Sequence, residues 1–414
     1  MLPTVPVPPR RLDDYKEAAG PEAVKRLREL AAPLAGVRVL HVNSTAFGGG
    51  VAELLFTQVP LMNDLGIETV WQVIEGAEDF FTVTKFAHNG LQGAQVPWTP
   101  DMEAIYLDRC RLNAEGLAQG FDYVIIHDPQ PAGILGALEE QGRRSGTWVW
   151  RCHIDLSAPH RPVLDFFAGQ VAGYDAAVFT MEEFAPPSLT EPRLFVIPPS
   201  IDPLSLKNVF VDHETVYEVL NRYGVDRSRP ILTQVSRFDP WKDPIGVVDA
   251  YRLARQECPG LQLLLIGSMA HDDPEGWHYL EVTEAYRQGD PDIFLLSNLQ
   301  EVGSLEVNAF QRASSVVVQK SLREGFGLVV SEAMWKEVPV VGGDVGGIRL
   351  QIEDGVTGFL VDSVEACAER IVQLLADAEL RSKMGRAGKE HVAERFLTLR
   401  ELEDYLRMLS VLAR

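Results

Sequence analysis

The sequence REGFGLVVSE, residues 323–332, lies between two short apolar segments, 315–318 and 338–341, that predict buried strands. Its two glycines interrupt the chain ahead of an amphipathic segment, which indicates a loop that leads into a helix. The backbone N–H groups and the positive dipole end at the start of such a helix favour a phosphate, although glycine turns also precede many helices that bind nothing. Glu324 would lie on the loop and Glu332 more than a turn inside the helix, so the two carboxylates can hold different parts of one extended ligand.

The alternation of strand and helix extends along the chain. Apolar segments that predict strands occur at 37–42, 69–74, 123–127 and 148–152, with helices such as 51–65 between them. A proline-rich segment, 196–203, interrupts this pattern and has the composition of a domain linker. The pattern then restarts, with strands predicted at 231–235, 261–266, 293–296, 315–318 and 338–341 and a closing amphipathic helix at 399–412. We therefore expect an α/β protein with two doubly wound, Rossmann-like domains, 1–200 and 201–395, and a ligand cleft between them.

Composition supports two hydrophobic cores and limits the partners. A chain of 414 residues with 46% hydrophobic residues exceeds what one core normally supports. Its formal net charge of −21 disfavours nucleic acid and anionic membranes, because the summed field repels polyanions. A phosphate ligand must therefore be held by local cations.

Cysteine usage and the N-terminus point to a reducing compartment. The four cysteines have no CxxC spacing, so we expect neither a zinc site nor a disulfide framework. The N-terminus is broken by prolines and shows no signal-peptide pattern, and no apolar run approaches the roughly 20 residues of a membrane span. We expect a cytoplasmic protein.

The local cations are found after the predicted strand 231–235. Arg237 and Lys242 lie in the sequence SRFDPWKD, residues 236–243, just before a predicted helix. A forked guanidinium and a compact ammonium together suit a diphosphate. In so acidic a chain, we interpret this pair as a ligand site rather than a solvated surface.

Three further strand ends carry candidate groups. The glycine turn Gly48, Gly49 and Gly50 would let a phosphate or sugar approach the backbone, or is simply a tight turn. It is not a GxGxxG motif and lacks a downstream acidic ribose partner, so a nicotinamide site is not indicated. Asp128 follows His127 at a strand end, where it would bind a hydroxyl or cap a helix. His153 also ends a strand and suits a hydroxyl or phosphate contact, though single histidines are more often structural.

One acidic pair has the spacing of a metal-binding motif. Asp290 and Asp292 form a DxD pattern, but the proline between them and the strand that follows favour a turn. We expect no metal site.

Taken together, these motifs resemble those of a known family. Arg237 with Lys242, followed by Glu324 and Glu332 in an E-x7-E arrangement, resembles the retaining GT-B glycosyltransferases, which include sucrose and glycogen synthases. The resemblance covers essentially the whole chain. Residues 41–53, 71–76 and 80–89 narrow it to the trehalose glycosyltransferring synthases. That resemblance implies a GT-B fold with a C-terminal helix, about 396–414, that returns to the first domain.

The resemblance also assigns site residues. Implied catalytic residues are His153, Arg237, Lys242 and Glu324. Implied donor contacts come from Gly48, Gly49, Gly50, Arg237, Lys242, Asn298, Phe326, Gly327, Leu328, Val329 and Glu332. Implied acceptor contacts come from Lys85, Asp128, His153 and Asp155. His127-Asp128 is similar to the strand-end HD of trehalose-phosphate synthases, but Pro129 replaces their aromatic residue.

The implied activity is retaining transfer from nucleoside diphosphate glucose (ADP-, UDP- or GDP-glucose) to free glucose, forming trehalose, by a homodimer. Cleavage of the donor leaves an anionic diphosphate, which Arg237, Lys242 and the helix dipole would stabilise without a metal or another cofactor. No carboxylate pair matches a retaining hydrolase, so we expect front-face transfer without a covalent intermediate. Alternatives are another glucosyl transfer (to sucrose, glycogen or a disaccharide phosphate, for which Arg151 and Arg161 leave room), a nucleotide-sugar epimerase, or a non-catalytic sensor.

Overall fold

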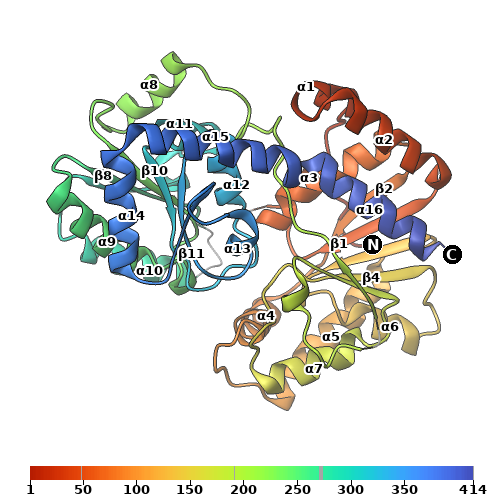
Figure 1. Ribbon diagram of the computed structural model, residues 1–414. Coiled ribbons are helices and arrows are strands. Elements are labelled where there is room, and N and C mark those ends of the chain that lie inside the picture. The colour runs from red at the N-terminus through yellow and green to blue at the C-terminus, as the bar shows by residue number, and fades with distance from the viewer. Residues whose placement is uncertain (48, 191, 270–273, 414) are drawn as a thin grey trace. The chain divides into compact units, whose positions relative to one another are not determined.

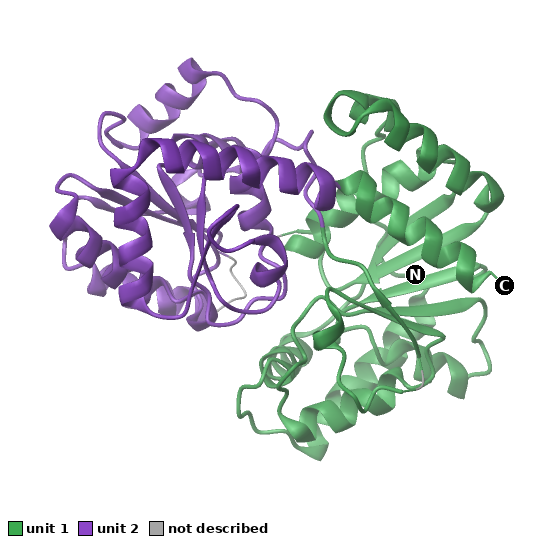
Figure 2. Ribbon diagram, in the orientation of Figure 1, with its two compact units in different colours: residues 1–199, 398–414 green, residues 200–397 purple. Residues whose placement is uncertain are grey.

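The chain folds into two compact units. The computed structural model describes residues 1–47, 49–190, 192–269 and 274–413. One unit contains residues 1–199 and 398–414, and the other contains residues 200–397 (Figure 2). The predicted border after residue 200 lies one residue from this division. The last helix, α16 (Thr398–Leu412), belongs to the first unit together with the N-terminal half of the chain.

A six-stranded parallel sheet forms the centre of the first unit. Its order is β2-β1-β3-β4-β5-β6, and the strands are β1 (Arg38–Asn43), β2 (Glu68–Val73), β3 (Tyr123–His127), β4 (Thr147–Arg151), β5 (Ala176–Phe179) and β6 (Arg193–Val196). The chain passes from β1 to β2 on one side and then returns to place β3 on the other side of β1. The carboxyl ends of β1 and β3 therefore flank a topological switch point, where α/β sheets bind ligands.

Helices cover both faces of this sheet (Figure 1). They are α1 (Lys16–Ala19), α2 (Pro21–Ala31), α3 (Gly50–Asp64), α4 (Glu78–Leu91), α5 (Pro100–Gly116), α6 (Ile134–Glu140), α7 (Arg161–Val171) and α16. One face packs against α4 to α7, around Trp148 and Trp150. The other packs against α2, α16 and the end of α3, and the Tyr123 hydroxyl donates to the Leu409 carbonyl at 3.0 Å. Both faces of the sheet are thus buried, as expected of a parallel sheet.

The second unit repeats the plan. Its parallel sheet has the order β12-β11-β10-β7-β8-β9, formed by β7 (Ile231–Val235), β8 (Gln262–Gly267), β9 (Ile293–Ser297), β10 (Val316–Gln319), β11 (Val340–Gly343) and β12 (Gly358–Val361). Here the switch point lies between β7 and β10. The helices are α8 (His213–Arg222), α9 (Pro244–Glu257), α10 (Pro274–Tyr286), α11 (Ser304–Ala313), α12 (Leu328–Trp335), α13 (Ile348–Gln351), α14 (Val364–Ala376) and α15 (Ala378–Arg395).

All nine predicted strands are present within two residues of their predicted bounds, but β5, β6 and β12 were not predicted. Two of the three are only four residues long and begin with residues that are depleted in strands, because β5 begins with two alanines and β12 with a glycine. The side chains of β6 are largely exposed at the sheet edge, and the predicted linker 196–203 begins on its last residue. Within the described residues, no helix has the length and apolarity needed to cross a membrane.

Candidate active site

The loop after β7 holds both predicted cations of the second unit. The Asp239 carboxylate accepts from the Lys242 backbone N–H at 3.1 Å and lies 3.0 Å from Nη2 of Arg237. Residues Pro240–Lys242 form a 3-10 turn, and Asp243 then takes a left-handed conformation (φ 50°) as the N-cap of α9. Lys320 pairs with Asp243 and fixes the loop from the β10 side. The helix predicted directly after strand 231–235 is thus preceded by a rigid turn that carries Lys242.

Glu324, on the loop after β10, meets Lys242 across the switch point. Nζ of Lys242 lies 2.6 Å from Oε2 of Glu324, and both side chains are largely buried. The same oxygen accepts from Ser321 Oγ at 3.1 Å and from Gln319 Nε2 at 3.4 Å. Within the described chain, every contact of this carboxylate falls on Oε2. Oε1 therefore keeps its acceptor capacity for a ligand.

Helix α12 begins directly beside this carboxylate. Gly327 is its N-cap and has a positive φ of 81°, a conformation that glycine adopts without strain. In the part of the chain that the structure describes, the amides of Phe326, Gly327 and Leu328 donate to no protein group. Nε2 of Gln351, at the end of α13, donates to the Phe326 carbonyl at 2.5 Å and so holds the loop that precedes α12. The start of α12 is thus an open set of N–H donors next to Lys242, as an anion site requires.

Glu332 lies inside α12, as predicted, and its side chain is buried. Oε1 lies 3.7 Å from Nζ of Lys207, and Oε2 accepts from Nε2 of Gln311 at 3.4 Å. Lys336 donates to the Glu332 carbonyl, and burial lowers the pKa of this lysine to about 7. Val329 occupies the first turn of the helix. The role of Glu332 toward a ribose remains a prediction.

In two further places in this unit, the side chains predicted as candidates make structural contacts within the protein. The Asn298 side-chain amide accepts from the Met269 backbone N–H at 2.7 Å and donates to the Met269 carbonyl at 3.0 Å. A contact between Asn298 and the nucleotide-sugar donor would therefore come from the backbone. Asp290 and Asp292 both pair with Arg255, at 2.6 and 2.8 Å. The DxD spacing therefore serves a turn that is tied to α9, in agreement with the interpretation preferred from sequence.

In the first unit, the glycine turn after β1 leads into α3. Gly49 is the N-cap and Gly50 the first residue of the helix, whereas Gly48 lies outside the described residues. Gly49 has an extended backbone, and a Cβ built there would meet no atom within 4 Å. The turn is open on that side.

Asp128 and His153 meet at the ends of β3 and β4. Oδ1 of Asp128 accepts from the His153 backbone N–H at 2.7 Å, and Asp128 has a positive φ of 64°. The alternative prediction that Asp128 caps a helix is wrong, because α6 begins at Ile134 and has Gly133 as its N-cap. The carboxylate instead fixes the backbone of His153. Burial raises the pKa of Asp128 from 3.8 to about 6, against the lowering effects of that bond and of Arg151.

This pKa predicts a stability effect of Asp128→Asn. An acid whose pKa is raised on folding contributes stability at low pH that is lost as the pH rises, here between about 4 and 6. Asparagine avoids the buried charge, still accepts from His153 and tolerates the positive φ. We expect the variant to be more stable than the parent by about 2 kcal/mol at pH 7 and of similar stability at pH 4, by urea denaturation. A loss of stability at pH 7 would contradict this assignment.

Asp212→Asn is the control, because folding shifts the pKa of Asp212 in the direction opposite to that of Asp128. The pKa of the exposed Asp212 is lowered, chiefly because its carboxylate accepts from the Thr215 backbone N–H at the start of α8. Its contribution to stability is therefore present above its ordinary pKa and lost on acidification. Asp212→Asn should gain nothing at pH 7.

The other predicted acceptor residues are Lys85 and Asp155. Lys85 is on α4, and Asp155 is buried, with Oδ1 accepting from the Ser157 backbone N–H in a local turn at 2.8 Å. Arg151, left open as a phosphate ligand, is fully buried and donates to the Ile197 carbonyl at 2.7 Å. Arg161 is exposed at the start of α7 and pairs with Asp165 at 2.6 Å.

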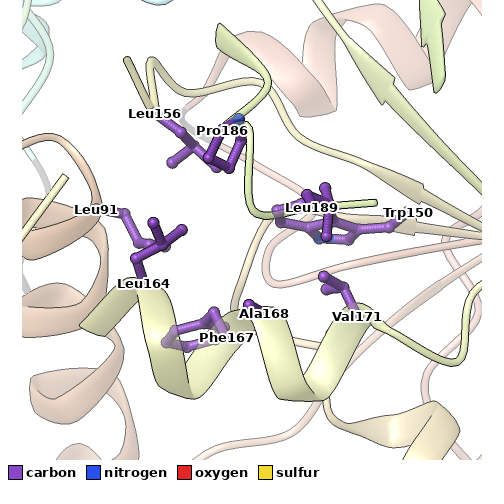
Figure 3. Close-up of a pocket in the computed structure, with 9 residues that line it drawn as sticks. All are labelled: Leu91, Trp150, Leu156, Leu164, Phe167, Ala168, Val171, Pro186 and Leu189. Carbon is purple, nitrogen blue, oxygen red and sulfur yellow. The ribbon is translucent and has the colours of Figure 1, made fainter. Parts of the chain in front are cut away.

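A small pocket lies in the first unit (Figure 3). It opens between α7, Trp150 of β4 and the segment around Pro186, and all of its lining side chains are apolar: Leu91, Trp150, Leu156, Leu164, Phe167, Ala168, Val171, Pro186 and Leu189. The indole N–H of Trp150 is already used, because it donates to the Asp128 carbonyl at 3.0 Å. With no polar group to bind hydroxyls, this pocket is unsuited to a sugar.

Several polar residues near the site were not singled out from sequence. Arg323 lies within the opening motif, with its guanidinium 5.9 Å from the Trp241 ring, and Lys320 braces Asp243. Lys336 follows Glu332 by one helical turn, a spacing that could have indicated it. His41 was not singled out either, and it forms a stack with His153 and with His127 of the predicted strand-end pair, described below. Their relation depends on strand order, which the sequence pattern did not supply.

Comparison with known proteins agrees with this architecture. Residues 41–186 match the family described as "Trehalose synthase, N-terminal domain", and residues 218–391 match "Glycosyl transferases group 1". Among solved structures, the chain is similar to sucrose-phosphate synthase from Thermosynechococcus elongatus, with a TM-score of 0.69 and 17% identity over 91% of this chain and 99% of that one. At this identity the likeness concerns the fold.

Two curated relatives are much closer in sequence. The chain is 52% identical to "Trehalose synthase" of Rubrobacter xylanophilus over 97% of each chain. It is 49% identical to "Trehalose synthase" of Thermococcus litoralis, again over 97% of each.

The two Rossmann-like units and these matches define a glycosyltransferase of the GT-B fold. The site of the second unit, with cations, a carboxylate and open amides at a switch point, lies where such a fold binds its ligand. Within that class, the chain belongs to the trehalose synthase family.

Proposed function

We propose that this chain transfers the glucosyl group of a nucleoside diphosphate glucose to free glucose, with retention of anomeric configuration, and so forms trehalose. The observation that carries the proposal is the pair of Lys242 and Glu324, 2.6 Å apart beside the open start of α12. This pair supports the proposal because a lysine ammonium suits a diphosphate and a carboxylate oxygen suits sugar hydroxyls, and the two lie on neighbouring loops. The names of the relatives support trehalose as the product.

The charge that develops on the leaving group explains the cations. Cleavage of the bond between the anomeric carbon and the phosphate oxygen leaves a nucleoside diphosphate anion, and preorganised donors lower the barrier most where charge develops. Arg237, Lys242 and the amides at the start of α12 would supply that stabilisation. The guanidinium of Arg237 is about half exposed and so accessible to a ligand.

Because these groups belong to the chain, we propose that the reaction needs no metal ion or other cofactor. Treatment with excess EDTA should leave the rate of transfer unchanged, measured by the release of nucleoside diphosphate. A loss of rate that Mg²⁺ restores would contradict this part of the proposal.

The carboxylates support front-face transfer rather than a covalent intermediate. A retaining hydrolase uses one carboxylate as a nucleophile about 5 Å from an acid partner. Glu324 already shares Oε2 with Lys242, Ser321 and Gln319, which suits hydroxyl binding better than nucleophilic attack. In the proposed step, the acceptor oxygen bonds to the anomeric carbon as the phosphate oxygen leaves, and that phosphate oxygen takes the acceptor proton.

The positions of Arg151 and Arg161 bear on whether the acceptor sugar carries a phosphate. A phosphorylated acceptor needs an accessible cation in the first unit, but Arg151 has no exposed surface and Arg161 pairs with Asp165 on an exposed helix turn. Neither arginine therefore supports a phosphorylated acceptor.

One incubation separates the proposed function from its rivals. The protein is mixed with ADP-, UDP- or GDP-glucose, with and without glucose, and the products are identified by NMR. We expect a 1,1-linked disaccharide only when glucose is present. Product formed from the donor alone would indicate an epimerase or a hydrolase, and product formed only with glucose 6-phosphate would indicate a disaccharide-phosphate synthase.

The family resemblance also supports a cytoplasmic homodimer as part of the proposal. Light scattering of the full chain should give about twice the chain mass of 45.9 kDa. A value equal to the chain mass would contradict the dimer.

A further inference from the structure

Three histidines from neighbouring strands form a stack in the first unit. Nδ1 of His41, on β1, lies 2.9 Å from Nε2 of His127, at the end of β3. Nδ1 of His127 in turn lies 3.0 Å from Nε2 of His153, two residues after β4. The ring centroids are 5.2 and 5.3 Å apart. Because β1, β3 and β4 are adjacent, the stack leads from the core to the candidate acceptor site.

The three rings are neutral at ordinary pH. Burial lowers the pKa of His41 to about 3 and the pKa values of His127 and His153 well below the usual range, and Arg151 lowers the latter two further. A neutral imidazole has one N–H donor and one lone pair. The central ring must therefore donate to one neighbour and accept from the other, so both hydrogen bonds run in the same direction.

Only two arrangements satisfy this requirement. In the first, His41 donates to His127, which donates to His153; Nε2 of His41 is then a lone pair, and Nδ1 of His153 carries a proton. In the second, every proton is on the opposite nitrogen. Nε2 of His41 then becomes a buried N–H, and Nδ1 of His153 becomes a lone pair.

The surroundings of His41 distinguish the two arrangements. Its Nε2 is buried and has no partner among the described residues. The neighbouring Tyr405 ring lies 6.4 Å from the His41 ring, and Arg151 and Gln58 both act on the Tyr405 hydroxyl. The unpaired buried atoms of these two residues are donors, namely Nε and Nη1 of Arg151 and Nε2 of Gln58.

A region with surplus donors favours a lone pair on His41, reached directly or through an internal water. An N–H at this position would be one more buried donor without a partner among the described residues, and such orphan donors are rarer than unpaired acceptors. The first arrangement is therefore favoured.

We propose that His41 and His127 are positioning residues that hold His153 in the tautomer protonated on Nδ1. Nε2 of His153 is occupied by His127, and the His153 backbone is held by Asp128, so Nδ1–H is the donor left for a ligand. His153 then presents a neutral hydrogen-bond donor to an oxygen of a bound sugar. The identity of that ligand rests on the proposed function.

The tautomer can be read in the free protein by long-range ¹H–¹⁵N NMR of histidine-labelled protein. His41→Asn and His41→Asp form a matched pair of equal size. The asparagine amide can donate to His127 and turn its oxygen toward the surplus donors, so it preserves the direction of the stack. Ionised aspartate can only accept, so above the pKa of this carboxyl it reverses the direction and moves the His153 proton to Nε2.

We expect His153 to be protonated on Nδ1 in the parent protein and in His41→Asn, and on Nε2 in His41→Asp. The kcat/KM for transfer should be roughly tenfold lower in His41→Asp than in His41→Asn, the cost of one lost neutral hydrogen bond. Thermal unfolding of both variants checks that each is folded.

Three results would overturn the proposal: an Nε2 proton on His153 in the parent, the same tautomer in both variants, or equal kcat/KM despite different tautomers. The NMR signal needs no substrate. A parent protein that makes no disaccharide would therefore contradict the proposed function separately, without changing the test of the tautomer.

Discussion

Lys242→Ala should lower kcat/KM for glucosyl transfer roughly 10²- to 10³-fold, as expected when one preorganised group that stabilises developing charge is removed. The cost in stability should be smaller, about 2 kcal/mol against the roughly 2.7–4 kcal/mol of that rate loss, because Glu324 keeps Ser321 and Gln319 as partners. Initial rates of nucleoside diphosphate release and urea denaturation measure the two effects. Unchanged turnover would remove Lys242 from the donor site.

Lys389→Ala is the matched control for this prediction. Nζ of Lys389 lies 2.8 Å from Oε1 of Glu337 in the same unit, but both side chains are nearly half exposed. Such surface pairs contribute little, about 0–1 kcal/mol. Turnover should be unchanged in Lys389→Ala, so an equal loss in both variants would indicate a general effect of removing a lysine.

Gly347→Ala should lower activity, because the added methyl group would clash with the loop at 325–327 that precedes α12. Gly347 adopts an ordinary helical conformation, so alanine brings no backbone strain. However, its Cβ would lie 2.5 Å from Cα of Phe326 and closer still to the Gly325 carbonyl oxygen, and both are backbone atoms that cannot rotate away. Overpacking of this kind costs about 1–3 kcal/mol. Displacing the amides at the start of α12 by about 1 Å should lower kcat/KM by roughly 10²-fold.

A second glycine provides the control. Gly169 lies in α7 on the exposed surface, and a Cβ there would meet no atom within 4 Å. Gly169→Ala should therefore stabilise the protein by up to about 1 kcal/mol without changing activity. If Gly347→Ala retained full activity, the loop at 325–327 would not be part of the donor site.

Much of the fold could be predicted because parallel strands buried on both faces are continuous apolar runs. The run YVIIH became β3 with its predicted bounds, 123–127. Where burial is incomplete, this signal fails: β6 is an exposed edge strand and was assigned in part to a linker. The strand orders, which place β3 beside β1 and β10 beside β7, depend on long-range packing that no local pattern encodes.

The candidate site was predictable where it consists of strand-end motifs and unpredictable where it depends on contacts across strands. Arg237, Lys242 and Glu324 were found because each follows an apolar run, and the structure adds the ion pair of the last two. His41 lies within β1 and gave no signal, since a histidine inside a strand is usually structural. Its contact with His127 follows from the adjacency of β1 and β3. Asp128 was considered as a helix cap because the proline after it was interpreted as a helix start, whereas turns at 129–133 delay α6 to Ile134.

The most direct test of the proposed retaining transfer to glucose follows the labelled carbon. A nucleoside diphosphate glucose with an α-linked, ¹³C1-labelled glucosyl group is incubated with unlabelled glucose, and the product is examined by NMR. The proposed function predicts a 1,1-linked disaccharide with ¹³C at the anomeric carbon of one ring only, in the α configuration. A β-linked labelled ring, or labelled free glucose as the main product, would contradict it.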